Sequence, residues 1–273
     1  MKFAICNELF EGWAFADVCR TIRELGYTGV EVAPFTLAPT VYDITEELRE
    51  EVRDTAMDLG VEVVGLHWLF AKTEGFSFTS PDAEVRRRTS EYLAELALCS
   101  YEMGGRLLVL GSPPARKIPP GVAKADAAQN FVDAVSDATL HITEFRQRLL
   151  LEPLGPAETD FMNTADEAEA IREWIDHPSV ALHLDVKAMS TESTSIPEVI
   201  RQHSNQMVHF HANDPNKRGP GMGDVDFRPI FKALKEVEYR GWVSVEVFDF
   251  TPDPVTIARA SIDYMRRVWD EIQ

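Results

Sequence analysis

Acidic and imidazole side chains stand at the ends of four successive apolar runs in the second half of the chain. Glu152 lies near the end of the run 148–153, Asp185 near the end of the next run, 180–186, His211 lies in the third, and Glu246 lies in the fourth. If these runs are adjacent parallel strands, three carboxylates meet at one end of the sheet, where they would repel one another strongly in a low dielectric. A bound divalent cation removes that repulsion. Four such residues at matching positions argue against isolated solvated loop carboxylates.

The donor types narrow the choice of ion. Three carboxylates and one imidazole form a mostly hard ligand set, which suits Mn²⁺ or Mg²⁺, with Co²⁺ or Zn²⁺ as alternatives. We therefore predict one divalent metal ion, with Mn²⁺ favoured, bound by Glu152, Asp185, His211 and Glu246.

Neighbouring histidines leave the choice of the imidazole ligand open. Side chains two residues apart share one face of a strand, so periodicity does not separate His209 from His211. His211 lies nearer the end of its run and is favoured as the ligand. His183 lies two residues before Asp185 and therefore shares a strand face with it. For His183 and His209 we favour a buried structural role. Glu31 is a carboxylate near the end of an early run that the sequence does not assign.

Short aliphatic and β-branched runs alternate with amphipathic segments along the chain. Runs that are apolar on both faces and alternate with helices indicate a parallel sheet covered by helices. Eight strand–helix units in about 250 residues match a (β/α)₈ barrel, whose active site lies at the C-terminal ends of the strands. We predict an α/β fold, a (β/α)₈ TIM barrel formed by residues 1–273 as a single domain. The predicted strands are 2–6, 29–33, 61–68, 106–111, 148–153, 180–186, 206–212 and 242–248.

Helix start and stop signals lie between these runs. Gly26 is placed to end the first helix, and Asp43 or Thr45 to cap the second. Thr164 and Glu167 have the spacing of a capping box. The segment 187–205 has the weakest helical pattern, and the Pro-rich segment 111–121 is predicted to be a loop. The alternative fold, an open doubly wound sheet, is disfavoured because no Gly-rich phosphate loop follows the first run.

Composition limits the partners. The net charge is −18 and the sequence pI is near 4.8, which argues against nucleic acid and anionic membrane surfaces. Three widely spaced cysteines, Cys6, Cys19 and Cys99, form no paired framework and suit a reducing compartment. The N-terminal residues lack the features of a signal peptide, and no apolar run reaches the length of a membrane span. We expect a cytoplasmic protein that acts on a small molecule.

Several of these segments resemble the xylose isomerase-like TIM barrels. More narrowly, they are similar to the sugar phosphate isomerase/epimerase family, in the group of D-tagatose 3-epimerase, hydroxypyruvate isomerase and inosose-processing enzymes. The resemblance covers nearly the whole chain, is strongest from residue 150 to 250, and identifies the superfamily better than the substrate. It is carried by LEPLGPAETDFMNTADEA (151–168), HLDV (183–186), HFHAND (209–214), GPGMGDVDF (219–227), EYRGWVSVEVFDF (238–250) and RELGYTGVEV (23–32).

The resemblance implies a metal site and a reaction. The family binds a divalent ion through Glu, Asp, His and Glu, which match Glu152, Asp185, His211 and Glu246. Its two glutamates, here Glu152 and Glu246, also move a proton alpha to a carbonyl through an enediolate. Such chemistry needs a base within hydrogen-bond reach and positive charge where the oxyanion develops. We therefore expect a metal-dependent sugar isomerase or epimerase of carbohydrate metabolism, with a homo-oligomeric assembly typical of such barrels.

The substrate-binding residues are less well defined. Glu158 matches a family position that contacts the substrate. The chain departs from the ketose epimerases at Ala188, where they have His, and at Lys217, where they have Arg; this puts 3-epimerisation of a free ketose in doubt. Lys217 and Arg218 are candidates for binding a phosphate or a sugar carboxylate. The full set of predicted substrate-binding residues is Glu158, His67, Trp68, Lys217, Arg218 and Asn7.

Three other functions stay open. The same metal site could serve a lyase or dehydratase that acts on an inosose or a 3-keto sugar. An endonuclease that cuts at abasic sites belongs to the same superfamily, but it uses further His and Asp ligands and a basic surface, which the net charge of −18 disfavours. A sugar-binding barrel without catalysis is the third alternative.

Overall fold

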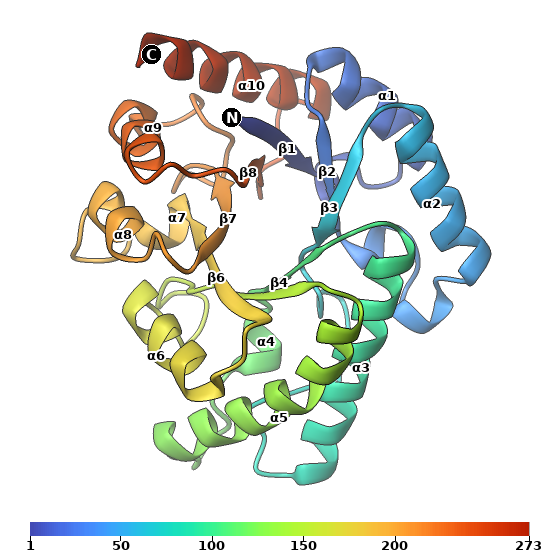
Figure 1. Cartoon of the computed structure of the whole chain (residues 1–273), viewed down its shortest axis with the longest axis vertical. Helices are drawn as coiled ribbons and strands as arrows, with labels where there is room; N and C mark the ends of the chain where they lie inside the picture. Colours follow the sequence, from blue (N-terminus) through green and yellow to red (C-terminus); the bar gives the residue numbers. More distant parts are fainter. Residues whose placement is uncertain (273) are drawn as a thin grey trace.

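The computed structural model describes residues 1–272, and in it eight parallel strands close into a barrel. Each strand pairs with its neighbour in sequence, and β8 pairs back with β1. Figure 1 shows the strands near the centre with the helices around them. This confirms the predicted (β/α)₈ fold. The strands are β1 (Lys2–Cys6), β2 (Gly29–Val32), β3 (Glu62–Leu66), β4 (Leu107–Leu110), β5 (Arg148–Leu151), β6 (Val180–Asp185), β7 (Met207–Ala212) and β8 (Trp242–Val245).

Ten α-helices and three short 3₁₀ helices are formed by the described residues. The α-helices are α1 (Phe15–Leu25), α2 (Glu46–Asp58), α3 (Ala83–Glu102), α4 (Pro113–Arg116), α5 (Lys124–Glu144), α6 (Ala165–Ile175), α7 (Val186–Met189), α8 (Ile196–Gln202), α9 (Phe227–Glu236) and α10 (Pro254–Glu271). The 3₁₀ helices are η1 (Asn7–Phe10), η2 (Pro34–Thr36) and η3 (Val41–Asp43). The segment predicted as a Pro-rich loop contains the single turn of α4, because proline is tolerated in the first turn of a helix.

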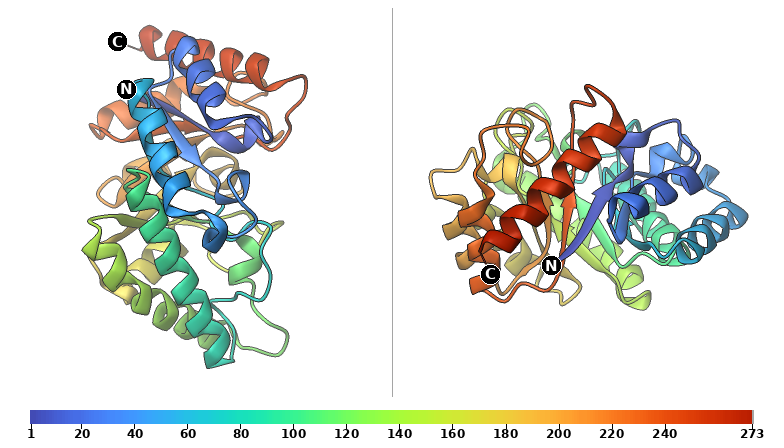
Figure 2. Two further views of the ribbon diagram at one scale, coloured as in Figure 1. Left: turned by 90° about the vertical axis from the view of Figure 1, so that its right-hand side faces the viewer. Right: turned by 90° about the horizontal axis from the view of Figure 1, so that it is seen from above.

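The local signals act as the sequence predicts. The Thr45 hydroxyl, rather than Asp43, caps α2 by accepting from the Leu48 amide, and Thr164 accepts from the amide of Glu167 at the start of α6. Gly26 ends α1 with a φ of 102°, a left-handed conformation that favours glycine. Figure 2 shows the last helix, α10, on the same side of the barrel as α1, so the two ends of the chain meet there.

The barrel interior changes from apolar to polar along the strands. On β6, Leu182 and Leu184 join the large outer core under the helices, whereas Ala181 packs with Val109 and Leu150 in a small separate cluster. His183 and Asp185 come next on the inward face of the same strand. None of the helices formed by residues 1–272 is long and apolar enough to cross a membrane.

An irregularity in the pairing of β6 with β7 positions the site. The register shifts by one residue after Leu182, so that His183 lies opposite His209 and Asp185 lies opposite His211. Bulges of this kind re-aim side chains and are frequent beside active sites. Both histidines of β7 are thereby brought level with the inward side chains of β6.

Candidate metal centre and active site

The four predicted metal ligands lie together at the C-terminal ends of β5 to β8. One ligand atom from each of Glu152, Asp185, His211 and Glu246 lies within 4.8 Å of the others, and all four residues are buried. Oxygen ligands lie about 2.0–2.6 Å from a hard divalent ion, so two ligands of one ion are at most about 5 Å apart. The cluster therefore has the dimensions of a site for one ion.

The donor atoms of this cluster are available to an ion. His211 Nδ1 is buried without a hydrogen bond and lies 3.2 Å from Glu246 Oε2 and 4.0 Å from Glu152 Oε1. No side-chain hydrogen bond to the Glu152 carboxylate is formed within residues 1–272. A buried nitrogen and a buried carboxylate left in this state are costly unless a further partner binds them. The residues present thus fit a hard or borderline divalent cation.

Electrostatics point to the same conclusion. Burial and the neighbouring Glu246 carboxylate raise the pKa of Glu152 to about 8, and the same two causes raise the pKa of Asp185 to about 6. Burial opposes ionisation of Glu246 as well, but the adjacent His211 outweighs it and lowers the pKa of that carboxyl. Three carboxyl groups so close do not ionise together easily, and a divalent cation among them would favour all three charged forms.

Glu31 contacts the predicted imidazole ligand, His211, from across the barrel. His211 Nε2 lies 3.2 Å and 3.3 Å from the two Glu31 oxygens, and His209 Nε2 lies 2.6 Å from Glu31 Oε1. A ligating histidine typically donates its other N–H to a carboxylate, which fixes the ring and its tautomer. Glu31 lies on β2, far from His211 in sequence, so no spacing pattern connects the two residues.

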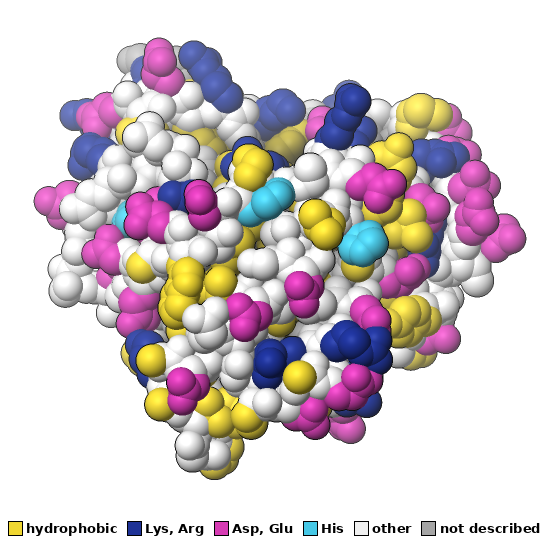
Figure 3. Space-filling view, turned by 60° about the horizontal axis from the view of Figure 1, so that its bottom comes forward, with side chains coloured by type: hydrophobic (Ala, Val, Ile, Leu, Met, Phe, Trp, Pro, Cys, Tyr) yellow, Lys and Arg dark blue, Asp and Glu magenta, His cyan; other side chains and the backbone are white. Residues whose placement is uncertain are grey.

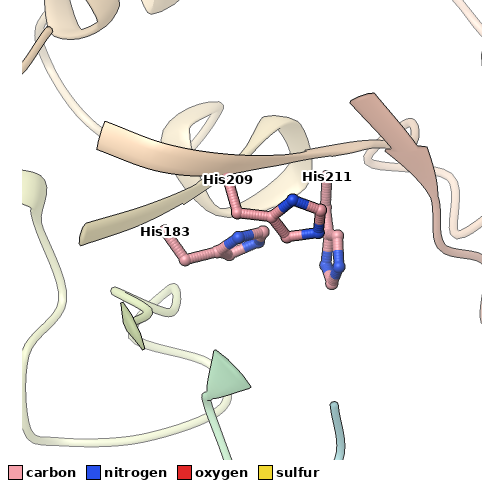
Figure 4. A group of neighbouring side chains, drawn as sticks. All are labelled: His183, His209 and His211. Atoms are coloured by element: carbon pink, nitrogen blue, oxygen red, sulfur yellow. The ribbon is translucent and has the colours of Figure 1, made fainter. Parts of the chain in front are cut away.

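His183, His209 and His211 form a layer of rings beside the metal site. Figure 4 shows the three side chains converging from the two neighbouring strands that carry them. The His183 and His211 ring centroids are 4.0 Å apart, and all three residues are buried. His183 Nε2 lies 3.7 Å from Glu152 Oε1, and neither ring nitrogen of His183 has a hydrogen bond. Burial lowers the pKa of His183 well below its ordinary value, so the ring is neutral.

Both oxygens of the Asp185 carboxylate are held in place. Its Oδ1 accepts from the Ala188 amide at 2.7 Å, which caps α7, and its Oδ2 accepts from the Asn213 side-chain amide. Asn213 Oδ1 in turn accepts from the Lys187 amide at 2.8 Å. The start of α7 and the end of β7 thus fix Asp185 with little freedom.

Glu246 is also fixed, through the loop after β3. Its Oε1 accepts from the Trp68 indole N–H at 2.7 Å and lies 3.4 Å from His67 Nδ1. His67 Nε2 lies 3.0 Å from Glu8 Oε2, deep in the barrel. Trp68 adopts a φ of 51°, which is unusual for a residue with a side chain and marks a strained position. This strain is associated with the contact that orients Glu246.

A cavity of about 310 Å³ opens above the metal site. Its acidic side is formed by Glu152, Glu158 and Glu246. Its other wall is largely apolar, which suits the C–H faces of a sugar ring. That wall consists of Trp68, Phe70, Ala71, Pro113, Pro114, Leu154 and Phe248, with His67 and Ser112 between them.

Three of the predicted substrate-binding residues, His67, Trp68 and Glu158, line this cavity. Asn7 does not. Its side chain donates to Thr36 Oγ1 at 2.8 Å and accepts from the Ala33 amide at 2.8 Å, so Asn7 ties η1 to the end of β2.

Lys217 and Arg218 also lie outside the lining of the cavity. Lys217 is exposed, and its backbone carbonyl accepts from the amides of Phe248 and Asp249. Arg218 Nε donates to Asp249 Oδ2 at 3.0 Å. The structure therefore gives this loop a role in holding the segment after β8, which carries Phe248 to the cavity.

Two cations beside the site were not identified from the sequence. Arg116 is fully buried and donates to the Glu152 backbone carbonyl at 2.6 Å, and burial lowers its pKa to about 10. Lys187 Nζ donates to Glu158 Oε2 at 2.6 Å. Lys187 follows Asp185 by two residues in a segment with weak periodicity, so only its closeness to a predicted ligand could have pointed to it.

The face shown in Figure 3 carries acidic and basic side chains interspersed with hydrophobic ones, without a continuous basic stripe. Binding of a nucleic acid backbone depends on such a stripe. This face therefore offers no electrostatic footprint for DNA.

Comparisons with known proteins agree with the fold. The model of the family described as "Xylose isomerase-like TIM barrel" matches residues 19–268. An L-ribulose 3-epimerase from Methylomonas sp. is 26% identical over 241 residues, which cover 86% of this chain and 80% of the relative. A D-psicose 3-epimerase from Agrobacterium fabrum is 26% identical, with 91% of this chain and 85% of the relative covered. A 3-dehydro-D-guloside 4-epimerase from Escherichia coli is 22% identical, with 97% and 99% covered.

Solved structures of other proteins have a fold similar to that of this chain. A D-psicose 3-epimerase determined in the presence of D-fructose superposes with a TM-score of 0.85 at 21% identity, covering 98% of this chain and 99% of that one. A 3-keto-D-glucoside 4-epimerase from E. coli gives a TM-score of 0.83 at 21% identity, with 98% of this chain and 99% of that chain covered. On the match over residues 19–268, this chain belongs to the xylose isomerase-like TIM barrel family.

Proposed function

We propose that this protein is a divalent-metal-dependent sugar epimerase or isomerase that moves a proton on the carbon next to a carbonyl. The observation that carries the proposal is the buried quartet of Glu152, Asp185, His211 and Glu246 at the floor of a cavity with an apolar wall. Relatives named as epimerases of L-ribulose, D-psicose and 3-dehydro-D-guloside support the class of reaction.

The quartet would hold the metal ion, with Mn²⁺ favoured. When bound, this ion supplies positive charge that polarises a substrate carbonyl and stabilises the negative charge that develops on its oxygen. The protein supplies the rest. Asp185 and His211 have their positions fixed by Asn213 and Glu31, so they contribute fixed ligands rather than mobile acids.

Glu152 and Glu246 are the proposed proton carriers. Glu152 lines the cavity and has a carboxylate free of side-chain hydrogen bonds within the described chain, so it is open to a proton of the bound substrate. Glu246 is oriented by the Trp68 indole. One carboxylate would remove the proton from the carbon next to the carbonyl. The other would return a proton to the opposite face, which inverts that carbon; return to the neighbouring carbon gives isomerisation.

The proposed substrate is an uncharged keto sugar. Three of the residues that line the cavity are carboxylates, and among the described residues no Lys or Arg lines it. A sugar phosphate would bring a dianion toward these carboxylates with no cation among the described residues that line the cavity to offset the repulsion, which is unfavourable. The free and buried Cys6, Cys19 and Cys99 support our inference of a cytoplasmic protein.

Deuterium exchange tests the proposal directly. The protein loaded with Mn²⁺ is incubated in D₂O with D-psicose, D-tagatose, L-ribulose and a 3-keto glucoside, and NMR measures deuterium incorporation next to the carbonyl. We expect the wild-type protein to exchange at least one of these sugars. The exchange rate should fall at least 100-fold in Glu152→Gln and in Glu246→Gln. The control Glu62→Gln, whose side chain is exposed, should exchange at the wild-type rate. Unchanged exchange in Glu152→Gln with Mn²⁺ still bound would disprove its role as a proton carrier.

A lyase is the second candidate, favoured by the extent of the apolar wall. Phe70, Pro113, Pro114 and Leu154 border the cavity and leave room for an aglycone beside the sugar. In a 3-keto glucoside, removal of the proton at C2 can expel the group on C1 as an alcohol or phenol, with formation of a C1–C2 double bond. Incubation with p-nitrophenyl 3-keto-glucoside distinguishes the two, because only the lyase releases p-nitrophenol.

A further inference from the structure

The ammonium group of Lys187 lies at the edge of the candidate active site. Lys187 is the second residue of α7, directly after β6, and its side chain is only 14% exposed. Its Nζ donates to Glu158 Oε2 at 2.6 Å and lies 4.8 Å from the centroid of the Phe248 ring. Glu158 and Phe248 both line the cavity. Lys187 thus contacts the acidic side and the aromatic wall at once.

The ammonium group of Lys187 has more hydrogen-bond donors than it has acceptors in the protein. A lysine ammonium has three N–H donors, and within residues 1–272 the Glu158 carboxylate is the one hydrogen-bond acceptor of Lys187 Nζ. Donors of a largely buried charge are costly to leave without acceptors. The cavity bounded by Glu158 and Phe248 is where such acceptors would bind.

The other cations near the site are placed differently. Arg116 also has donors without partners, Nε and Nη2, but its side chain is fully buried and donates to the Glu152 backbone carbonyl, whereas the Lys187 side chain is partly exposed. Arg218 is paired with Asp249, and the side chain of Lys217 is exposed. Lys187 is therefore the cation best placed to meet a molecule that enters the cavity.

We propose that Lys187 is a substrate-binding residue whose ammonium donates hydrogen bonds to an oxygen of the uncharged keto sugar in the cavity. The inference rests on the proposed function and deepens it. Because Glu158 balances the charge of Lys187, the pair recognises hydroxyl and carbonyl oxygens, and it does not provide the unpaired charge that a phosphate requires. Glu158 keeps the ammonium at the cavity and offers its second oxygen to a neighbouring sugar hydroxyl.

A structural role makes a different prediction. If Lys187 only offsets the charge of the metal ligands, its removal would change the affinity for Mn²⁺ and leave sugar binding unaffected. The test must therefore measure the metal and the sugar separately.

The test compares Lys187→Met with Lys124→Met. Lys124 also pairs with a glutamate, Glu167, at 2.8 Å, but it lies at the exposed start of α5. The substrate is the ketose that the wild-type protein exchanges fastest. For Lys187→Met we expect KM to rise at least 10-fold while the Kd for Mn²⁺, from calorimetry, changes less than threefold. Lys124→Met should change neither value.

Monodeoxy forms of the same ketose then locate the contact. The wild-type protein should lose at least 10-fold in kcat/KM when the contacted hydroxyl is absent, and Lys187→Met should show no further loss with that sugar. An unchanged KM in Lys187→Met, a defect confined to Mn²⁺ affinity, or equal losses for every deoxy sugar in both proteins would overturn the proposal. If the wild-type protein exchanges no ketose at all, the proposed function fails, and this assignment fails with it.

Discussion

Glu31 Oε2 lies 3.2 Å from His211 Nε2, while the other nitrogen of that ring, Nδ1, lies 3.2 Å from Glu246 Oε2. One buried carboxylate thus fixes the far side of the imidazole, and the near side faces the metal site. Glu31 also accepts from His209, so its two contacts connect β2 with β7 across the barrel. We therefore expect the metal affinity to depend on Glu31, which is not one of the four predicted ligands.

Replacing Glu31 by Gln should weaken Mn²⁺ binding by about 10- to 100-fold, the usual cost of removing a carboxylate behind a ligating histidine. Calorimetric titration of Mn²⁺ measures this loss. Glu62→Gln, on the exposed start of β3, is the control and should bind Mn²⁺ as the wild type does. Equal affinity in Glu31→Gln would mean that packing alone orients the His211 ring.

Trp68→Phe removes the indole N–H that donates to Glu246 while retaining an aromatic wall. Loss of a hydrogen bond to a charged group costs about 1.5–3 kcal/mol, so we expect kcat to fall by about 10- to 100-fold. Mn²⁺ affinity should change much less, because the ligand atoms remain. Trp174→Phe, half exposed on α6, should leave kcat unchanged. A Trp68→Phe protein with normal kcat would show that His67 suffices to orient Glu246.

Metal affinity should rise with pH. Burial and Glu246 raise the pKa of Glu152 to about 8, so below pH 8 this carboxyl holds a proton that Mn²⁺ must displace. Affinity therefore increases by up to about tenfold per pH unit between pH 6 and 8 and levels off above that. Titrations at several pH values measure the slope. In Glu152→Gln, whose amide does not ionise, the slope over this range should decrease, and the part that remains belongs to His211, whose pKa the neighbouring Glu246 and Glu31 raise, and to Asp185. An unchanged slope would assign the proton to groups other than Glu152.

Gly65 is required by the close approach of β3 and β4. A Cβ at this position would lie 1.9 Å from the Leu107 carbonyl oxygen, an atom of the backbone that pairs with Gly65. Gly65→Ala should therefore lower the free energy of unfolding by about 1–3 kcal/mol or more, as overpacking of a core does. Gly75→Ala is the comparison, since Gly75 has open space around it and a φ of 79°. It should cost about 1 kcal/mol. Chemical denaturation measures both, and equal losses would contradict the steric argument.

The sequence predicted the barrel, and with it the clustering of the four candidate ligands, because both follow from the alternation of strands and helices along the chain. Strand–helix alternation sets the fold, and closure then brings Glu152, Asp185, His211 and Glu246 to one end. Family and fold are confirmed by the match over residues 19–268 and by the closed sheet. The roles of these four residues stay predictions.

Contacts across the barrel could not be predicted from the sequence. Glu31 meets His211 from a strand far away in sequence, and the spacing of either residue says nothing of the other. Asn7 ends a strand, as a substrate-binding residue would, but a nearby threonine and backbone amide occupy its side chain. Lys217 has a suitable charge, yet its loop turns the side chain to solvent. The direction in which a side chain points, more than its residue type, therefore decides which predicted residues reach the cavity.

The ring of strands closes only when β8 pairs with β1. The predicted donor groups come from the last four strands and their ends, whereas Glu31 and Trp68, which contact His211 and Glu246, come from β2 and from the loop after β3. A nascent chain that has emerged only in part therefore lacks a complete coordination sphere. Binding of the ion would therefore show that the N-terminal and C-terminal strands of the barrel have assembled. Loss of the ion would be an early sign that they separate.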